Sequence, residues 1–289
     1  MDVTNGYPKS DKELKEMLAT TANTTAVPFY EGQAQEKSSP DIATEIVDLP
    51  SKGYFYPEGH PLSSGKLEMK YMTAKEEDIL SSPTLIKQGV VIDRLIQALI
   101  VDKINYNDLL VADKNGLLIA ARILAYGPQY DVEIVCPNCG AKNNMSIDLG
   151  QFESKDLDYS SIQKGQTEFE YKFRNGKVIT YKFLTHGDEK NIEQDIKGYN
   201  KIKAASGVDA QLSTRLKHII TSVDGNRDKV TINKFVDNML SVDSLAFRKH
   251  LKEYTPDIDL TFSFACGACD HVDDKMMLPL GVSFFWPGA

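Results

Sequence analysis

Four cysteines in two Cys-x-x-Cys pairs are the residues of this chain whose types and spacing point most clearly to chemistry. The first pair is Cys136 and Cys139, the second is Cys266 and Cys269, and the sequence has no other cysteine. Two such pairs on tight turns can supply four thiolates in a tetrahedron around one metal ion. Zinc is the ion expected for four thiolates without a redox motif. Such a site is closed and structural, because no position remains for a water molecule.

The gap between the two pairs is longer than in common zinc-binding modules. Cys139 and Cys269 are 130 positions apart, whereas about 15–20 residues usually separate two such pairs. The alternatives are four unrelated thiols or two pairs that form disulfides, and an iron–sulfur cluster is disfavoured because its typical spacing is absent. His271 could replace one cysteine as a ligand, although a solvent-facing turn residue is the simpler interpretation.

Alternating apolar and polar residues predict a β-hairpin at each cysteine pair. The alternating apolar residues are Tyr130, Val132, Ile134, Met145, Ile147 and Leu149 around the first pair, and Ile258, Leu260, Phe262 and Phe264 before the second. Each pair is therefore expected at a hairpin tip, where both thiols can face one point.

Further strands and helices are predicted before and between these hairpins. The predicted strands are Lys66–Met72, Thr167–Phe173 and Val178–Leu184. A first helix is predicted to begin at Thr73, and a second to run from Thr84 or Val90 to Val101. Further helices are predicted over 113–126, 188–205, 209–222 and 232–254, with a break in the last near Ser241. The segment Arg174-Asn175-Gly176-Lys177 joins two of these strands into a hairpin. The aromatic residues of both strands lie on the same face of the sheet only if the loop has three residues, with Gly176 in the left-handed conformation.

The two halves of the sequence match in the same order, which indicates an internal duplication. The matching pairs are Thr73 with Thr185, Arg94 with Arg215, Asp102 with Asp224, Tyr126 with Tyr254, and Cys136 with Cys266. The offset between partners rises from 112 to 130 and never decreases, as small insertions would require. The predicted fold is therefore α+β, with two pseudo-repeats (β-hairpin, helices, Cys-x-x-Cys hairpin) joined through a zinc-ribbon-like four-cysteine site.

Composition divides the chain into a tail and a globular unit. Residues 1–42 carry a net charge of −3 and have no apolar period, so a flexible acidic N-terminal tail is predicted, with an arm that folds on a partner as the alternative. Residues 43–289 are predicted to form a single globular unit, with pseudo-repeats at about 46–150 and 165–280 and an aromatic C-terminal tail at 281–289. Phe284, Phe285 and Trp286 are expected to dock on the protein's own core or to anchor a partner.

Several functional classes are disfavoured by charge and by missing motifs. The net charge is −8, which argues against binding nucleic acid through bulk electrostatics. The apolar stretches Val90–Val101 and Leu117–Ala125 contain charged residues and are too short for a membrane span. Phosphate-binding loops, dinucleotide fingerprints, His-Glu-x-x-His and Gly-x-Ser-x-Gly are absent, and the five histidines are not placed for catalysis, so an enzyme is not expected.

Several longer motifs together resemble the baseplate hub assembly proteins of T-even-type contractile-tailed bacteriophages. The motifs are Asp48-Leu49-Pro50-Ser51-Lys52-Gly53-Tyr54-Phe55-Tyr56, the segment from Tyr71 to Leu80, the segment from Leu117 to Gly127, Cys136-Pro137-Asn138-Cys139, and the aromatic C-terminal tail. The resemblance runs from about Ile46 to the end of the chain and brings no catalytic residues with it.

The resemblance implies a phage tail baseplate hub assembly factor or hub component that acts by protein–protein contact, with structural zinc. Its implied partners are baseplate hub and tail proteins, and its implied location is the host cytoplasm during assembly or the virion tail. The alternative is a zinc-ribbon nucleic-acid-binding protein, which should display a clustered basic face. An unrecognised enzyme is the third interpretation, and it would need a polar pocket with converging titratable groups.

Overall fold

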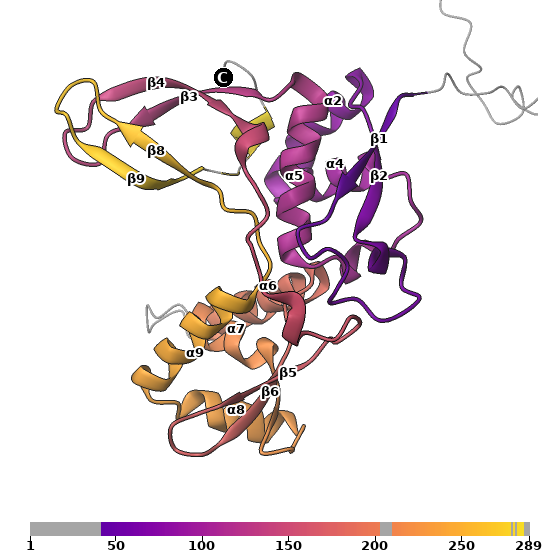
Figure 1. Ribbon diagram of the computed structural model, residues 1–289, viewed down its shortest axis with the longest axis vertical. Helices are drawn as coiled ribbons and strands as arrows, with labels where there is room; N and C mark the ends of the chain where they lie inside the picture. Colours follow the sequence, from indigo (N-terminus) through magenta and orange to yellow (C-terminus); the bar gives the residue numbers. More distant parts are fainter. Residues whose placement is uncertain (1–41, 203–209, 279, 281, 286–289) are drawn as a thin grey trace, which may run out of the picture. The chain divides into compact units, whose positions relative to one another are not determined.

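The computed structural model describes residues 42–202, 210–278, 280 and 282–285, and its contacts divide the chain between Asp41 and Ile42. All of the described residues belong to the second unit, Ile42–Ala289. The tail predicted for residues 1–42 lies outside the described residues except for Ile42, and so does Trp286. Helices and small antiparallel sheets alternate along the second unit, which confirms the α+β class (Figure 1).

The first part of the unit is a pair of strands followed by four helices. Strand β1 (Thr44–Asp48) pairs antiparallel with β2 (Lys66–Lys70). The helices are α2 (Ala74–Leu80), α3 (Pro83–Gln88), α4 (Val91–Leu99) and α5 (Val111–Tyr126). Of the two starts predicted for the helix before Val101, the one at Val90 is confirmed and the one at Thr84 is wrong, because Gly89 ends α3 in the left-handed conformation with a φ of 71°. The sequence pattern also misses β1, whose side chains are mostly exposed.

The second part contains a three-stranded sheet and four helices. Its strands lie in the order β5 (Phe169–Lys172), β6 (Val178–Tyr181) and β7 (Ile220–Val223), and its helices are α6 (His186–Ile202), α7 (Gln211–Ile219), α8 (Lys229–Asp237) and α9 (Ser241–Tyr254). The helix predicted over 209–222 is wrong at its end, because Ile220–Val223 pairs with β6. Sheet pairing overrides the helical period there, as tertiary context often does. The break predicted near Ser241 is confirmed.

The loop between β5 and β6 confirms the predicted register. Phe173 N–H donates to the carbonyl oxygen of Lys177 at 2.8 Å, which leaves a three-residue loop, and Gly176 has a φ of 86°. Tyr171 consequently lies opposite Ile179. The aromatic side chains of both strands therefore share one face of the sheet and pack in the core.

Two further hairpins carry the cysteine pairs. The first is β3 (Gln129–Val135) with β4 (Lys142–Asp148), and the second is β8 (Thr261–Ala265) with β9 (Val272–Met277). Figure 1 shows β3 and β4 beside β8 and β9, although more than a hundred residues separate them along the chain. The predicted hairpin around each Cys-x-x-Cys is confirmed.

A buried carboxylate fixes the turn that follows β1. Asp113, on α5, accepts hydrogen bonds from the backbone N–H of Ser51 at 2.8 Å, from the Ser51 hydroxyl at 2.7 Å and from the Tyr56 hydroxyl at 2.6 Å. In the same turn Gly53 has a φ of 75°, and a Cβ there would lie 2.5 Å from the carbonyl oxygen of Ser63. Ser51 thus holds the turn on α5, and Gly53 allows the turn to pack closely against the backbone of Ser63.

Phe284 and Phe285, near the end of the chain, dock on the protein's own core. Phe284 and Phe285 are each 1% exposed, and the Phe284 ring meets the Tyr130 ring edge-on at 5.1 Å. The carbonyl oxygen of Phe284 accepts a hydrogen bond from Nε of Arg122, which is itself buried on α5. Of the two interpretations of the aromatic tail, docking on the core therefore holds for Phe284 and Phe285.

Helix α2 begins at a buried capping box. The Glu76 carboxylate accepts hydrogen bonds from the backbone N–H and the hydroxyl of Thr73 at 3.0 and 2.6 Å, and from Nζ of Lys70 at 2.7 Å. Burial raises the pKa of this carboxyl, but the hydrogen bonds from Lys70 and Thr73 outweigh burial and hold it at about 2. The ionised form of Glu76 therefore stabilises the fold.

We predict that Glu76→Gln removes part of the acid sensitivity of the fold. The folded pKa lies below the ordinary value of 4.5, so the stabilisation is present above pH 4.5 and is lost as the pH falls toward about 2. The shift corresponds to about 3 kcal/mol. Urea unfolding between pH 7 and pH 3 should show a steeper loss of unfolding free energy in the wild type than in Glu76→Gln. Asp78→Asn, at an exposed position of the same helix, is the control and should keep the wild-type slope; equal slopes in all three proteins would contradict the prediction.

We also predict that Phe284→Ala lowers the unfolding free energy by about 3–5 kcal/mol, because it leaves a cavity in a packed site. Leu245→Ala, which truncates a side chain that is 46% exposed, should cost less than about 1 kcal/mol. Urea unfolding at pH 7 measures both, and a similar cost for the two variants would contradict the docking of the C-terminal segment.

Candidate metal centre

Each cysteine pair lies on a turn that its own backbone closes. In the first hairpin Cys136 N–H donates to the carbonyl oxygen of Ala141 at 2.8 Å, and Gly140 has a φ of 73°. In the second, Cys266 N–H donates to the carbonyl oxygen of His271 at 2.8 Å, and Asp270 has a φ of 53°. In both turns, a residue in the left-handed region four positions after the first cysteine thus reverses the direction of the chain. Aspartate is one of the few non-glycine residues that tolerate this region.

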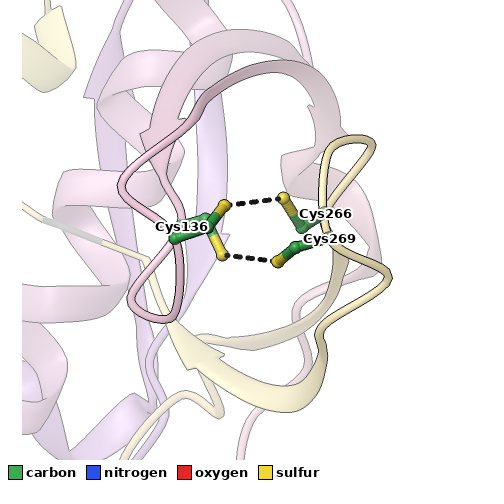
Figure 2. A group of neighbouring side chains, drawn as sticks. Cys136, Cys266 and Cys269 are labelled. Atoms are coloured by element: carbon green, nitrogen blue, oxygen red, sulfur yellow. Dashed lines mark hydrogen bonds between the residues drawn. The ribbon is translucent and has the colours of Figure 1, made fainter.

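The structure brings all four predicted site residues together. Their sulfur atoms lie within 4.8 Å of one another. Across the two hairpins, the sulfur of Cys136 is 3.8 Å from that of Cys269, and the sulfur of Cys139 is 3.7 Å from that of Cys266 (Figure 2). A tetrahedron with metal–sulfur bonds of about 2.3 Å has sulfur–sulfur edges of about 3.8 Å. The two distances across the hairpins match that edge and the other sulfur pairs lie within 4.8 Å, so the cluster is compatible with one zinc ion.

The four thiols differ in exposure and in hydrogen bonding. Cys136 and Cys266 are buried, Cys139 is exposed, and none forms a disulfide. The Ala268 N–H donates to the sulfur of Cys266 at 3.4 Å and lowers the pKa of that thiol to about 6. For Cys139, a hydrogen bond from the Ala141 N–H lowers the pKa, but hydrogen bonding with the neighbouring sulfurs outweighs it and raises the pKa to about 12. A bound cation would favour the thiolate form of all four cysteines.

Two asparagine side chains of the first hairpin also contact the sulfurs of the second. Nδ2 of Asn143 lies 3.7 Å from the sulfur of Cys266, and Nδ2 of Asn138 lies 3.6 Å from that of Cys269. The sequence alone predicts no role for either side chain, because their partners lie on the other hairpin. Among the described residues the group of potential ligands contains the four cysteines and not His271.

A short antiparallel neck sets the second hairpin beside the first. Asp259 N–H donates to the carbonyl oxygen of Glu153 at 3.1 Å, and Lys155 N–H donates to that of Asp257 at 2.8 Å. The ammonium group of Lys155 also contacts the carbonyl oxygens of Lys252 and Glu253 at the end of α9. A positive charge at a helix C-terminus is favourable. Together these contacts hold the segment that enters β8 against the segment that follows β4.

A second group of titratable residues lies between α4, α5 and the start of α6. Asp93 forms an ion pair with Lys114 at 2.5 Å, one of its carboxylate oxygens lies 3.7 Å from Nε2 of His186, and it accepts a hydrogen bond from Tyr106. Burial lowers the pKa of His186, so the ring is neutral at pH 7. These residues line a polar cavity of about 1100 Å³. Their pairing with each other is typical of a network that joins helices, and the sequence analysis does not identify it.

Comparison with known proteins gives one family for the chain. Residues 44–286 match the family described as T4 bacteriophage base plate protein, and the chain belongs to this family. The resemblance to T4-type baseplate proteins is thereby confirmed. No curated protein and no solved structure matches the chain. None of the described helices is both long enough and apolar enough to cross a bilayer.

Proposed function

We propose that this member of the T4 base plate family works in the central hub of the phage tail baseplate, as an assembly factor or a hub component that acts by protein–protein contact. The observation that carries the proposal is the family match over residues 44–286. Its partners are then baseplate hub and tail proteins. Its places are the host cytoplasm during assembly and, if it is a hub component, the tail of the virion.

The four cysteines are proposed to hold one structural zinc ion. Their sulfur spacing supports this role, and four thiolates are the donor set that zinc prefers. When bound, the ion would tie the β3–β4 hairpin to the β8–β9 hairpin. Because four protein ligands fill its coordination, the proposal gives the metal a role in the fold and none in hydrolysis.

Two pseudo-repeats, at about 46–150 and 165–280, are proposed for the globular unit, 43–289. Matching contacts support them. Lys70 and Thr73 bond to Glu76 at the start of α2, as Lys182 and Thr185 bond to Asp188 at the start of α6. In each half a carboxylate also accepts a hydrogen bond from the backbone N–H of a strand residue. Glu68 N–H donates to Asp102, and Val178 N–H donates to Asp224. Each series of elements then ends in a hairpin with a cysteine pair.

Charge favours protein contact over the nucleic-acid alternative. The strands and turns of the two cysteine hairpins, residues 129–148 and 261–277, hold six acidic residues and two lysines. Zinc ribbons that read nucleic acid need a basic face to neutralise phosphates. An acidic module of this kind repels phosphates and suits a partner with a basic surface.

The metal proposal predicts about one zinc ion per wild-type chain and none in Cys136→Ser or in Cys266→Ser. Because one ion would join both hairpins, each substitution should reduce the protection of both hairpins from hydrogen exchange. The unfolding free energy should fall by about 4 kcal/mol or more. Elemental analysis measures the zinc, and hydrogen exchange measures protection of β3–β4 and β8–β9. Asn144→Ala, at an exposed position of β4, is the control and should keep the metal. Full zinc content in either cysteine variant, or faster exchange confined to the substituted hairpin, would contradict a shared ion.

For the hub role, a tagged chain recovered from infected cells should bring baseplate hub proteins with it, as identified by mass spectrometry. The same analysis of purified particles distinguishes a hub component, which is present, from an assembly factor, which is absent. Nuclease treatment before recovery should leave the protein partners unchanged. Recovery with polynucleotide and without tail proteins would overturn the proposal in favour of the nucleic-acid alternative.

A further inference from the structure

Contacts other than the sulfurs also hold the two cysteine hairpins together. Asn143, on β4, donates from Nδ2 to the carbonyl oxygen of Ala141 at 3.0 Å, within its own turn, and reaches the sulfur of Cys266 at 3.7 Å. Its Oδ1 accepts the backbone N–H of Gly267 at 3.0 Å. The Asn143 side chain thus contacts the backbone and one thiol of the second turn, and it is hydrogen-bonded to the first turn as well.

The arrangement is one-sided. Asn138 and Asn143 stand two and seven positions after Cys136, and the corresponding positions after Cys266 are Ala268 and Asp273. Alanine has no side-chain donor, and the Asp273 carboxylate accepts the N–H of Lys275 in its own strand. In the part of the chain that the structure describes, the amide side chains that reach across the centre therefore come from the first hairpin.

These donors suit a metal centre made of four thiolates. Four thiolates and one divalent cation carry a net charge of −2, and N–H groups aimed at the sulfurs offset that charge. Outer groups that orient ligands typically change metal affinity by about 10–100-fold when they are removed. The bond from Gly267 to Asn143, by contrast, joins two protein groups and needs no metal.

We propose that Asn143, assisted by Asn138, is a positioning residue of the four-cysteine centre. It docks the Cys266–Cys269 turn on the first hairpin and donates an N–H to a ligand sulfur, so that zinc binds a site whose two halves already face each other. The inference rests on the proposed zinc centre for its effect on metal affinity, whereas the docking step can be observed without metal.

The first test is zinc affinity, measured by competition with a chromophoric chelator in the full-length protein. Asn143→Ala removes the donor and the acceptor, and the affinity should fall by about 10–100-fold. Asn143→Asp keeps an acceptor for the Gly267 N–H but loses the donor and adds a negative charge, so it should bind zinc at least as weakly as Asn143→Ala. Asn144→Ala is the matched control and should bind like the wild type. Wild-type affinity in Asn143→Asp would show that the N–H donor has no role.

The second test follows the Gly267 amide by hydrogen exchange in the metal-free protein. Asn143→Ala should speed exchange at Gly267 while leaving the β5–β6 hairpin as protected as in the wild type. With cobalt in place of zinc, the sulfur-to-cobalt charge-transfer bands should also shift in Asn143→Ala but not in Asn144→Ala.

The outcomes separate this inference from the zinc proposal. A wild type that binds no zinc would refute the metal centre, and faster Gly267 exchange in metal-free Asn143→Ala would still support the docking contact. A wild type that binds zinc, with affinity, spectrum and Gly267 exchange all unchanged in Asn143→Ala, would leave the metal proposal standing and overturn the role of Asn143.

Discussion

Contacts that tether the second cysteine hairpin at both ends are the constraint on which the convergence of the four thiols depends. The two hairpins are far apart in the sequence, yet their sulfurs lie within 4.8 Å of one another. The second hairpin is tethered at both ends: the neck from Glu153 to Asp259 holds its entry, and Phe284 docks beside Tyr130 after its exit. The protein contacts therefore bring the cysteines close before any ion is considered, and an ion would complete a site that packing has largely built.

A closed centre of this kind contributes shape rather than reactivity. Four sulfurs leave a bound zinc without an open position, so its effect would be to fix the angle between two hairpins whose surfaces are acidic. The buried Asp113 network, in the first turn of α5, likewise fixes the turn around Ser51.

Short sequence patterns predicted those parts of the fold that depend on interactions between residues close in the sequence. The aromatic faces on either side of Gly176 required a three-residue loop, and the structure has one. Both cysteine hairpins and the start of α2 at Thr73 were likewise readable from alternation and capping. The segment Ile220–Val223 was not, because its strand exists only through pairing with β6. Asn143 could not be found at all, since its partners Cys266 and Gly267 lie in the other half of the chain.

The asparagine contacts also bear on how two similar halves can work as one protein. If the hairpins arose by duplication, as proposed, a symmetric ancestor would have presented the same side chain from each hairpin to the other. In the present chain the two positions hold Asn143, which reaches across, and Asp273, which bonds within its own strand. Two carboxylates facing the thiolates would add repulsion, whereas an amide supplies donors. One hairpin can therefore act as the fixed platform and the other as the docked element, an asymmetry that fusion into a single chain permits.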